Sequence, residues 1–220
     1  MPKIKGLIFD LDGTLTLTQQ FHAQAFGEVF KKYGINYTTD DDLRHSGEGS
    51  RQIFPRIFAE HGINITEKQI EQYSEEKKVI YSQIIANAQI ETVPGIKKFL
   101  ERMKKQGLKM IVASGNKLEA AETILKRTKI REYFQEIVTN KDVEKSKPAP
   151  DIFLKAAEKL NLKPAKCCVF EDSINGIIAA KTGKIPCIAI TTGTESAKLK
   201  KAGAKFTVKD YNEITDQMLN

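Results

Sequence analysis

The sequence predicts an α/β protein built on a doubly wound parallel sheet, with one helical insertion. Short apolar runs alternate with amphipathic stretches of about ten residues, which is the pattern of strand–helix–strand units. The alternation is interrupted once, between residues 17 and 90, where helical patterns follow one another without a convincing strand. We therefore expect a catalytic sheet core from residues 1–16 and 91–220, and a helical cap domain from residues 17–90.

The elements of the core follow from the same pattern, in order. Residues 4–9 are a hydrophobic run with β propensity, and Gly107 ends an amphipathic helix that we expect at 96–106. The later apolar runs predict strands at 108–113, 136–139, 167–170, 186–190 and 205–208. The amphipathic stretches between them predict helices at 117–128, 149–161, 174–182 and 195–202.

The insertion is long enough to be a small domain of its own. It leaves the sheet directly after the first strand, so it should cover the carboxyl ends of the strands as a lid, with hinges near 15–18 and 88–93. Its amphipathic patterns predict helices at 19–33, 40–45, 50–61 and 66–88.

Composition narrows the class of protein. Hydrophobic residues make up 40% of the 220 residues, which is ordinary for a globular chain. The formal net charge is +7, but the lysines are scattered over helical stretches, so we expect solvated helix faces and no nucleic-acid partner. No apolar stretch approaches the roughly 20 residues that span a bilayer, and no signal peptide is recognisable. We expect a cytoplasmic monomer without a membrane partner.

The cysteines fit a reducing compartment. Cys167 and Cys168 lie in an apolar run that predicts a buried strand, and Cys187 begins another. The histidines lie in a different part of the chain, so none is placed to activate a catalytic cysteine. We therefore expect buried core thiols.

The first strand ends in the most informative motif of the chain. Asp10 and Asp12 are separated by one residue and followed by Gly13 and Thr14. Two close carboxylates repel each other unless a cation or a proton neutralises them, and Mg²⁺ would leave one carboxylate oxygen free as a nucleophile. An ordinary strand-to-turn junction would also explain the pattern if it stood alone.

Two further motifs follow later strands. Ser114, Gly115 and Asn116 end an apolar run before a helix, where a hydroxyl and free backbone N–H groups can cradle a phosphate. Lys147 stands in a proline-fixed loop before another helix and can present its charge to a phosphate and to a nucleophilic carboxylate. Taken alone, the Ser114 motif would also fit an ordinary turn, and Lys147 would also fit a surface lysine before a helix.

The fourth motif is a second strand that ends in acids. Glu171 and Asp172 follow the apolar run at 167–170, with Ser173 at a helix start. Acids on two strand ends can converge on one metal ion as a hard oxygen site. An acidic N-cap would account for Asp172 but not for all four motifs together.

Taken together, the four ordered motifs resemble the haloacid dehalogenase-like hydrolase superfamily, in particular its phosphatase and β-phosphoglucomutase group, over essentially the whole chain. The resemblance implies a Rossmann-like core and phosphoryl transfer through an aspartyl phosphate on Asp10. Asp12 would be the general acid and then the base, and its backbone carbonyl would ligate Mg²⁺. Ser114 and Lys147 would hold the transferring phosphoryl group.

The metal site and the reaction class follow from the same resemblance. Asp10 and Asp172 would ligate Mg²⁺, with Glu171 ligating directly or through water. Dehalogenases and phosphonatases lack the second acid, so Asp12 indicates phosphate-ester chemistry. We expect a Mg²⁺-dependent phosphatase of a small phosphorylated metabolite, such as a sugar phosphate. The alternative is a β-phosphoglucomutase-like sugar phosphomutase, which shares every core residue. A non-catalytic binding protein would normally have lost one of them.

The cap motifs are less explicit. Thr18 and His22 fit the same group, and His22 could reach the site or be a packed or surface histidine. The polar loop at 45–51 falls where related caps carry a specificity loop with a basic residue. Arg51 could therefore grip a second phosphate or a sugar hydroxyl, or simply begin a solvated helix. Leu17 departs from the family, where relatives commonly have an acid.

Overall fold

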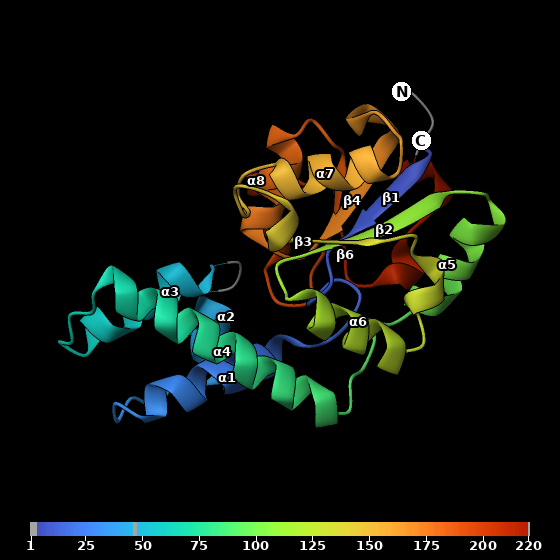
Figure 1. Ribbon diagram of the computed structural model, residues 1–220. Coiled ribbons are helices and arrows are strands. Elements are labelled where there is room, and N and C mark those ends of the chain that lie inside the picture. Colours follow the sequence, from blue (N-terminus) through green and yellow to red (C-terminus); the bar gives the residue numbers. More distant parts are fainter. Residues whose placement is uncertain (1–3, 46–47, 220) are drawn as a thin grey trace. The chain divides into compact units, whose positions relative to one another are not determined.

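The computed structural model describes residues 4–45 and 48–219. The chain divides into two compact units (Figure 1). The core unit comprises the described residues of Met1–Leu17 and Ile90–Asn220, and the helical unit those of Thr18–Gln89. None of the helices in the described ranges combines the length and apolar character needed to cross a membrane.

The core unit contains one six-stranded sheet in which all paired neighbours are parallel. Its strand order is β3-β2-β1-β4-β5-β6, so the first strand lies in the middle and the chain winds outward in both directions. This is the doubly wound sheet that the alternation of strands and helices predicts. The strands are β1 Gly6–Phe9, β2 Lys109–Ser114, β3 Ile137–Thr139, β4 Cys167–Glu171, β5 Cys187–Ile190 and β6 Phe206–Val208.

Helices cover both faces of this sheet, α5 and α6 on one side and α7 and α8 on the other (Figure 1). The α-helices of the core are α5 Ile96–Lys105, α6 Leu118–Arg127, α7 Asp151–Lys159, α8 Ile174–Thr182 and α9 Ser196–Ala202. Short 3₁₀ turns complete it: η1 Arg131–Tyr133, η2 Asn140–Asp142, η3 Pro164–Lys166, η4 Tyr211–Glu213 and η5 Asp216–Leu219.

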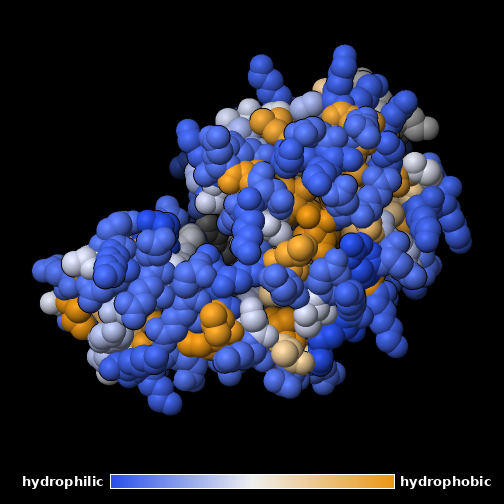
Figure 2. Space-filling view, viewed as in Figure 1, coloured by the Kyte–Doolittle hydropathy of each residue, from blue (hydrophilic) through white to orange (hydrophobic). Residues whose placement is uncertain are grey.

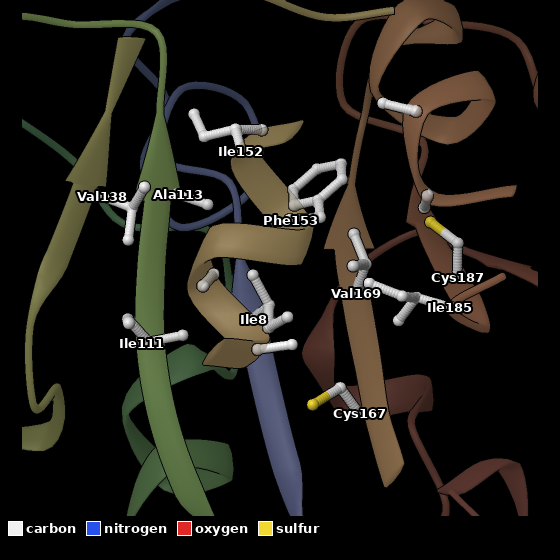
Figure 3. Close-up of a cluster of buried hydrophobic side chains, with 14 of the residues drawn as sticks. Ile8, Ile111, Ala113, Val138, Ile152, Phe153, Cys167, Val169, Ile185 and Cys187 are labelled. Atoms are coloured by element: carbon white, nitrogen blue, oxygen red, sulfur yellow. The ribbon is translucent and has the colours of Figure 1, made fainter. Parts of the chain in front are cut away.

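The two faces of the sheet bury different side chains because successive residues of a strand point to opposite faces. On the α7 and α8 side, an aliphatic cluster joins the strands to these helices (Figure 3). Its central members are Ile8, Ile111, Val169, Ile152 and Phe153. It also contains Cys167 and Cys187, free thiols like Cys168. Burial raises the pKa of the Cys167 thiol to about 11, so the expectation of inert core thiols holds.

The opposite face carries an aromatic cluster. The rings of Phe9 and Phe170 stack at 4.8 Å between centroids, and both pack against Phe99 of α5. Tyr211 of η4 contacts the same three rings. Such ring pairs add stability beyond the apolar area they bury. The two residues that immediately precede the acids of β1 and β4 are therefore held firmly by packing on this face.

The helical unit contains α1 Gln19–Lys31, α2 Thr39–Arg44, α3 Ser50–Glu60 and α4 Glu67–Asn87. Its own core is aromatic and includes Phe26, Phe30, Phe54, Phe58 and Tyr73. The unit therefore has a hydrophobic core independent of the sheet, which is what a separate domain requires. Thr66 caps α4, since its hydroxyl accepts a hydrogen bond from the Gln69 N–H.

The predicted elements are all found, and only their ends differ. Ser114, expected just beyond a strand, is instead the last residue of β2, because it continues the pairing with Thr139 of β3. The helix expected at 149–161 begins only at Asp151, after Pro150. Polar side chains cover most of the visible face of each unit (Figure 2). Among described residues, the exposed large apolar side chains are Tyr33, Val79, Leu118, Leu154 and Ile178.

Candidate active site

The motif residues of the core meet at one edge of the sheet. Phe9 of β1 pairs in register with Phe170 of β4 and with Val112 of β2. The next residues along these strands are Asp10, Glu171 and Ala113, and the Asp10 N–H donates to the Phe170 carbonyl at 3.0 Å. Since the strands are parallel, their carboxyl ends lie at the same edge, which is where ligands bind in open α/β sheets.

A tight turn after β1 fixes the first motif. Gly13 has a φ of 77°, a left-handed conformation that favours glycine. Its N–H donates to the Thr16 carbonyl at 2.7 Å, and its own carbonyl accepts from the Thr192 hydroxyl at 2.6 Å. The hydroxyl of Thr14, which is fully buried, donates to Asp172 Oδ1 at 3.3 Å. The turn therefore connects the first acidic motif to the fourth.

Lys147 lies between the acids of two strands. Its Nζ donates to Asp10 Oδ1 at 2.5 Å and to Glu171 Oε1 at 2.6 Å. Burial alone lowers the pKa of Lys147, but the charges of Asp10 and Glu171 outweigh this and hold the pKa above its usual value. Burial raises the pKa of Asp10 to about 7, although Lys147 opposes the shift. The lysine is thus a permanent cation against the predicted nucleophile.

Glu171 is held on both carboxylate oxygens. Its side chain is 1% exposed, and Oε1 accepts from Lys147. Oε2 accepts from the N–H of Asp172 at 2.9 Å, the N–H of Ser173 at 2.8 Å and the Ser173 hydroxyl at 2.9 Å. A buried carboxylate needs such partners to offset its desolvation. Its predicted role as a metal ligand stays a prediction, since these contacts tie it to Lys147 and to the start of α8.

The second acid of the first motif contacts the second motif. Asn116 donates from Nδ2 to Asp12 Oδ2 at 2.6 Å, and its backbone N–H donates to the Ser114 hydroxyl oxygen at 3.2 Å. Ser114 is fully buried at the end of β2, and the Gly115 carbonyl accepts from Asn140 at 3.5 Å. Asn116, predicted as a phosphate contact, thus lies against the predicted general acid.

The acidic residues at this edge fit a hard divalent cation. Asp10 and Glu171 share Lys147, and the pKa of Asp10 is raised by burial together with the charges of Glu171 and Asp12. Asp172 follows Glu171 directly and is linked to the turn after β1 by the Thr14 hydroxyl. In the described ranges no group of three or more His, Cys, Asp or Glu side chains has the spacing of a complete metal site. Mg²⁺ does not need one, because it usually takes one or two carboxylates and keeps waters or substrate phosphate as its other ligands.

In the helical unit, His22 of α1 lies against α4. Its Nδ1 is 2.5 Å from Lys77 Nζ, and its ring stacks on Tyr81 at 4.0 Å between centroids. Lys77 is itself buried and lies over the Phe26 ring. Burial raises the pKa of nearby Asp42, although His22 and Lys77 oppose the shift. His22 therefore belongs to a partly buried polar cluster within this unit.

The other predicted cap residues flank helices. Thr18 is buried and precedes α1 as its N-cap residue. Arg51 lies in the first turn of α3, where its exposed guanidinium pairs with Glu67 of α4. Residues 46 and 47 of the predicted loop lie outside the described residues. A substrate contact by Arg51 stays a prediction.

The sequence pattern does not mark three residues of these clusters as functional. Lys77 stands in a helix rich in charged residues, and Thr14 fits an ordinary turn. Gly176 lies within α8, where a Cβ would overlap the carboxylate of Glu171. Nothing in the sequence alone indicates these contacts, apart from the presence of a glycine inside a predicted helix, which often has a packing reason.

The chain is similar to known hydrolases over most of its length. The family model described as haloacid dehalogenase-like hydrolase matches residues 7–190. A phosphorylated carbohydrates phosphatase of Thermotoga maritima is 32% identical over 209 residues, covering 94% of each chain. A β-phosphoglucomutase of Bacillus subtilis is 29% identical over 222 residues, covering 99% of this chain and 94% of the relative.

A solved structure shares the fold. The crystal structure of CbbY from Rhodobacter sphaeroides in complex with phosphate superposes with a TM-score of 0.80 at 27% identity, covering 96% of each chain. The resemblance inferred from the four motifs is therefore confirmed over most of the chain. The chain belongs to the haloacid dehalogenase-like hydrolase family and is an enzyme of its phosphatase type.

Proposed function

We propose that this enzyme is a Mg²⁺-dependent phosphatase that hydrolyses a small phosphorylated metabolite, with a sugar phosphate as the favoured class, through an aspartyl phosphate on Asp10. The observation that carries the proposal is Lys147, whose Nζ lies 2.5 Å from Asp10 and 2.6 Å from Glu171 at the sheet edge. A cation fixed against a carboxylate suits phosphoryl transfer, which depends mainly on positioning and charge neutralisation. The phosphatase from Thermotoga maritima supports the substrate class.

In the first half of the reaction, a carboxylate oxygen of Asp10 attacks phosphorus and the bond to the leaving oxygen breaks. Asp12 gives its proton to that oxygen, so the alcohol leaves neutral. Lys147 and Ser114 bind the non-bridging oxygens. In the second half, Asp12 takes a proton from water as the water attacks phosphorus, which releases phosphate and restores Asp10.

The metal ion would be held by Asp10 and Asp172, with the Asp12 carbonyl completing the protein ligands and Glu171 as a further candidate. When bound, Mg²⁺ would neutralise phosphate charge and orient the oxygens for in-line displacement. The Thr14 hydroxyl, 3.3 Å from Asp172 Oδ1, would keep that carboxylate in one orientation.

We also propose that the helical unit acts as the lid expected from the sequence and selects the substrate. An aspartyl phosphate has to be shielded during transfer, while substrate and product must pass. Arg51, with its exposed guanidinium, is the proposed distal contact.

A second candidate function is a sugar phosphomutase, favoured by the likeness to the β-phosphoglucomutase of Bacillus subtilis. The two reactions differ in whether water or a second sugar hydroxyl accepts the phosphoryl group from Asp10.

The test is a screen of the purified protein with Mg²⁺ against phosphorylated metabolites, with released phosphate as the readout. Glucose 1-phosphate, primed with the 1,6-bisphosphate, is followed separately for glucose 6-phosphate. Free phosphate from one or more sugar phosphates, absent with the Asp10→Asn variant, would support the phosphatase. Isomerisation without phosphate release would support the mutase, and the absence of both reactions would refute the proposal.

A further inference from the structure

Glu171 occupies a niche under the first turn of α8. Its Oε2 accepts three hydrogen bonds from Asp172 and Ser173, and its Oε1 accepts one from Lys147. Ser173 is also the N-cap residue of this helix, since its hydroxyl oxygen accepts from the Gly176 N–H at 3.0 Å. The orientation of the Glu171 carboxylate and the start of α8 are therefore one hydrogen-bonded arrangement.

The niche exists because residue 176 has no side chain. A Cβ built on Gly176 would overlap the carboxyl carbon of Glu171 and both of its oxygens. Gly176 is buried in a helix and its φ is not left-handed, so backbone conformation does not demand glycine there. Alanine would even favour the helix by about 1 kcal/mol. The physical reason for a glycine at position 176 is therefore the space that it leaves for the Glu171 carboxylate.

We propose that Gly176 is a positioning residue for phosphoryl transfer. By leaving room for the carboxylate of Glu171, it lets that carboxylate hold the ammonium of Lys147 against Asp10. Gly176 touches no reacting atom and acts only through Glu171 and Lys147. This inference rests on the proposed phosphatase function.

A methyl group at position 176 would overlap the carboxylate of Glu171 in its present position. The side chain can rotate away, but it then gives up its contacts with Ser173 and Lys147 and carries a buried charge into a new environment. Lys147 keeps Asp10 as a partner but loses the second acid that aligns it. The substitution should therefore change the orientation of Lys147 and have little effect on any substrate contact made by the helical unit.

The test is a double-mutant cycle of Gly176→Ala and Glu171→Ala, measured with p-nitrophenyl phosphate and saturating Mg²⁺. Each single variant should lower kcat by about 10- to 100-fold, the usual effect of losing a residue that orients another, with KM changed less than about threefold. The double variant should be no slower than Glu171→Ala alone, because the methyl group then enters an empty niche. Gly183→Ala is the matched control at the other end of α8, where the Cβ meets Pro150 at 3.3 Å, and should keep kcat.

The melting temperature of the metal-free proteins gives a second readout that is independent of activity. The Gly176→Ala substitution should lower the melting temperature when Glu171 is present and raise it when Glu171 is already replaced by alanine. If Gly176→Ala does not fold but the double variant does, the added methyl group prevents folding only when Glu171 is present, which also supports the inference. Failure of both to fold would overturn the inference, because the niche would then serve something other than Glu171.

Two kinetic results would also overturn it. A Gly176→Ala enzyme with kcat close to wild type would show that the niche does not matter for the reaction, and multiplicative losses in the double variant would show that Gly176 acts elsewhere. The proposed function fails separately, if the wild-type protein hydrolyses no phosphate ester. In that case the catalytic role of Gly176 is also refuted. The melting temperatures of the single and double variants still show whether Gly176 makes room for Glu171.

Discussion

Replacing Lys147 by methionine removes the only basic side chain found within hydrogen-bond distance of Asp10 in the described residues. The change keeps most of the side-chain volume but leaves Asp10 and Glu171, with side chains 12% and 1% exposed, as neighbouring carboxylates without the ammonium between them. Removing one partner of a buried ion pair costs about 3–5 kcal/mol. In a chain of this size about 1 kcal/mol moves the melting temperature by roughly 2–4 °C, so we expect a loss of about 6 °C or more without metal.

The rate should fall as well. A preorganised cation that meets developing charge is worth about 10²- to 10³-fold in kcat, the effect measured when one such donor is removed. Added Mg²⁺ should restore part of the lost stability, since it replaces positive charge beside Asp10. It should restore little of the rate, because it does not replace the proposed contact between the lysine and the phosphoryl group.

The stability loss should also depend on pH. Burial already raises the pKa of Asp10 to about 7 with Lys147 opposing the shift, so loss of the lysine raises this pKa further. A carboxyl group whose pKa is higher in the folded state destabilises that state increasingly as pH rises from its unfolded value near 4 towards its folded value. The deficit of the Lys147→Met variant should therefore be smaller at pH 5 than at pH 8.

The assay compares thermal melts with and without Mg²⁺ at both pH values, together with kcat for a sugar phosphate. Lys145→Met is the matched control, because Lys145 is exposed in the same loop. A Lys147→Met variant that melts within about 2 °C of wild type and keeps kcat within about threefold would refute the reasoning, since both losses follow from one buried ion pair.

The remaining predictions concern the reaction itself. Asp10→Asn should lower turnover by about 10⁴-fold or more with the fold intact by circular dichroism, because an amide is a poor nucleophile. Excess chelator should abolish phosphate release and Mg²⁺ should restore it; full activity with chelator would contradict a metal site. Asn116→Ala should slow alkyl phosphates more than p-nitrophenyl phosphate, whose leaving group needs no proton from Asp12; equal losses would speak against this role. Arg51→Ala should raise KM for the physiological substrate but not for the small aryl phosphate; equal effects would leave Arg51 as the helix residue that pairs with Glu67.

The fold could be predicted from the sequence because each element carries a local signal. Buried strands such as β1 and β4 are continuous apolar runs that end abruptly in acids, and the helices between them show one apolar face. Parallel strands then bring every carboxyl end to one edge, so the four motifs had to meet. The helix ends differ by up to two residues, where turn residues and prolines decide the boundary.

The contacts within the site could not be predicted in the same way, because they depend on orientation across long separations. Asn116 and Asp12 are 104 residues apart, and Lys77 and His22 are 55 apart. In the sequence Asn116 is a turn residue and Lys77 one of many helix lysines. Only the folded structure shows that Asn116 is held against an acid and that Lys77 is buried with its ammonium over an aromatic ring.

The alternation of side chains along β1 and β4 explains why adjacent acids at the site have different contacts. Phe9 and Phe170 are paired in register and both face the aromatic cluster, so Asp10 and Glu171, one residue further, face the side of α7 and α8. The loop that precedes α7 carries Lys147 on that side, and the first turn of α8 lies over Glu171. Asp172 is one residue beyond the strand and turns instead towards Thr14. The two neighbouring acids are therefore not interchangeable: Glu171 contacts the lysine and Asp172 contacts Thr14, so in the proposed mechanism the first would orient the lysine and the second would ligate the metal.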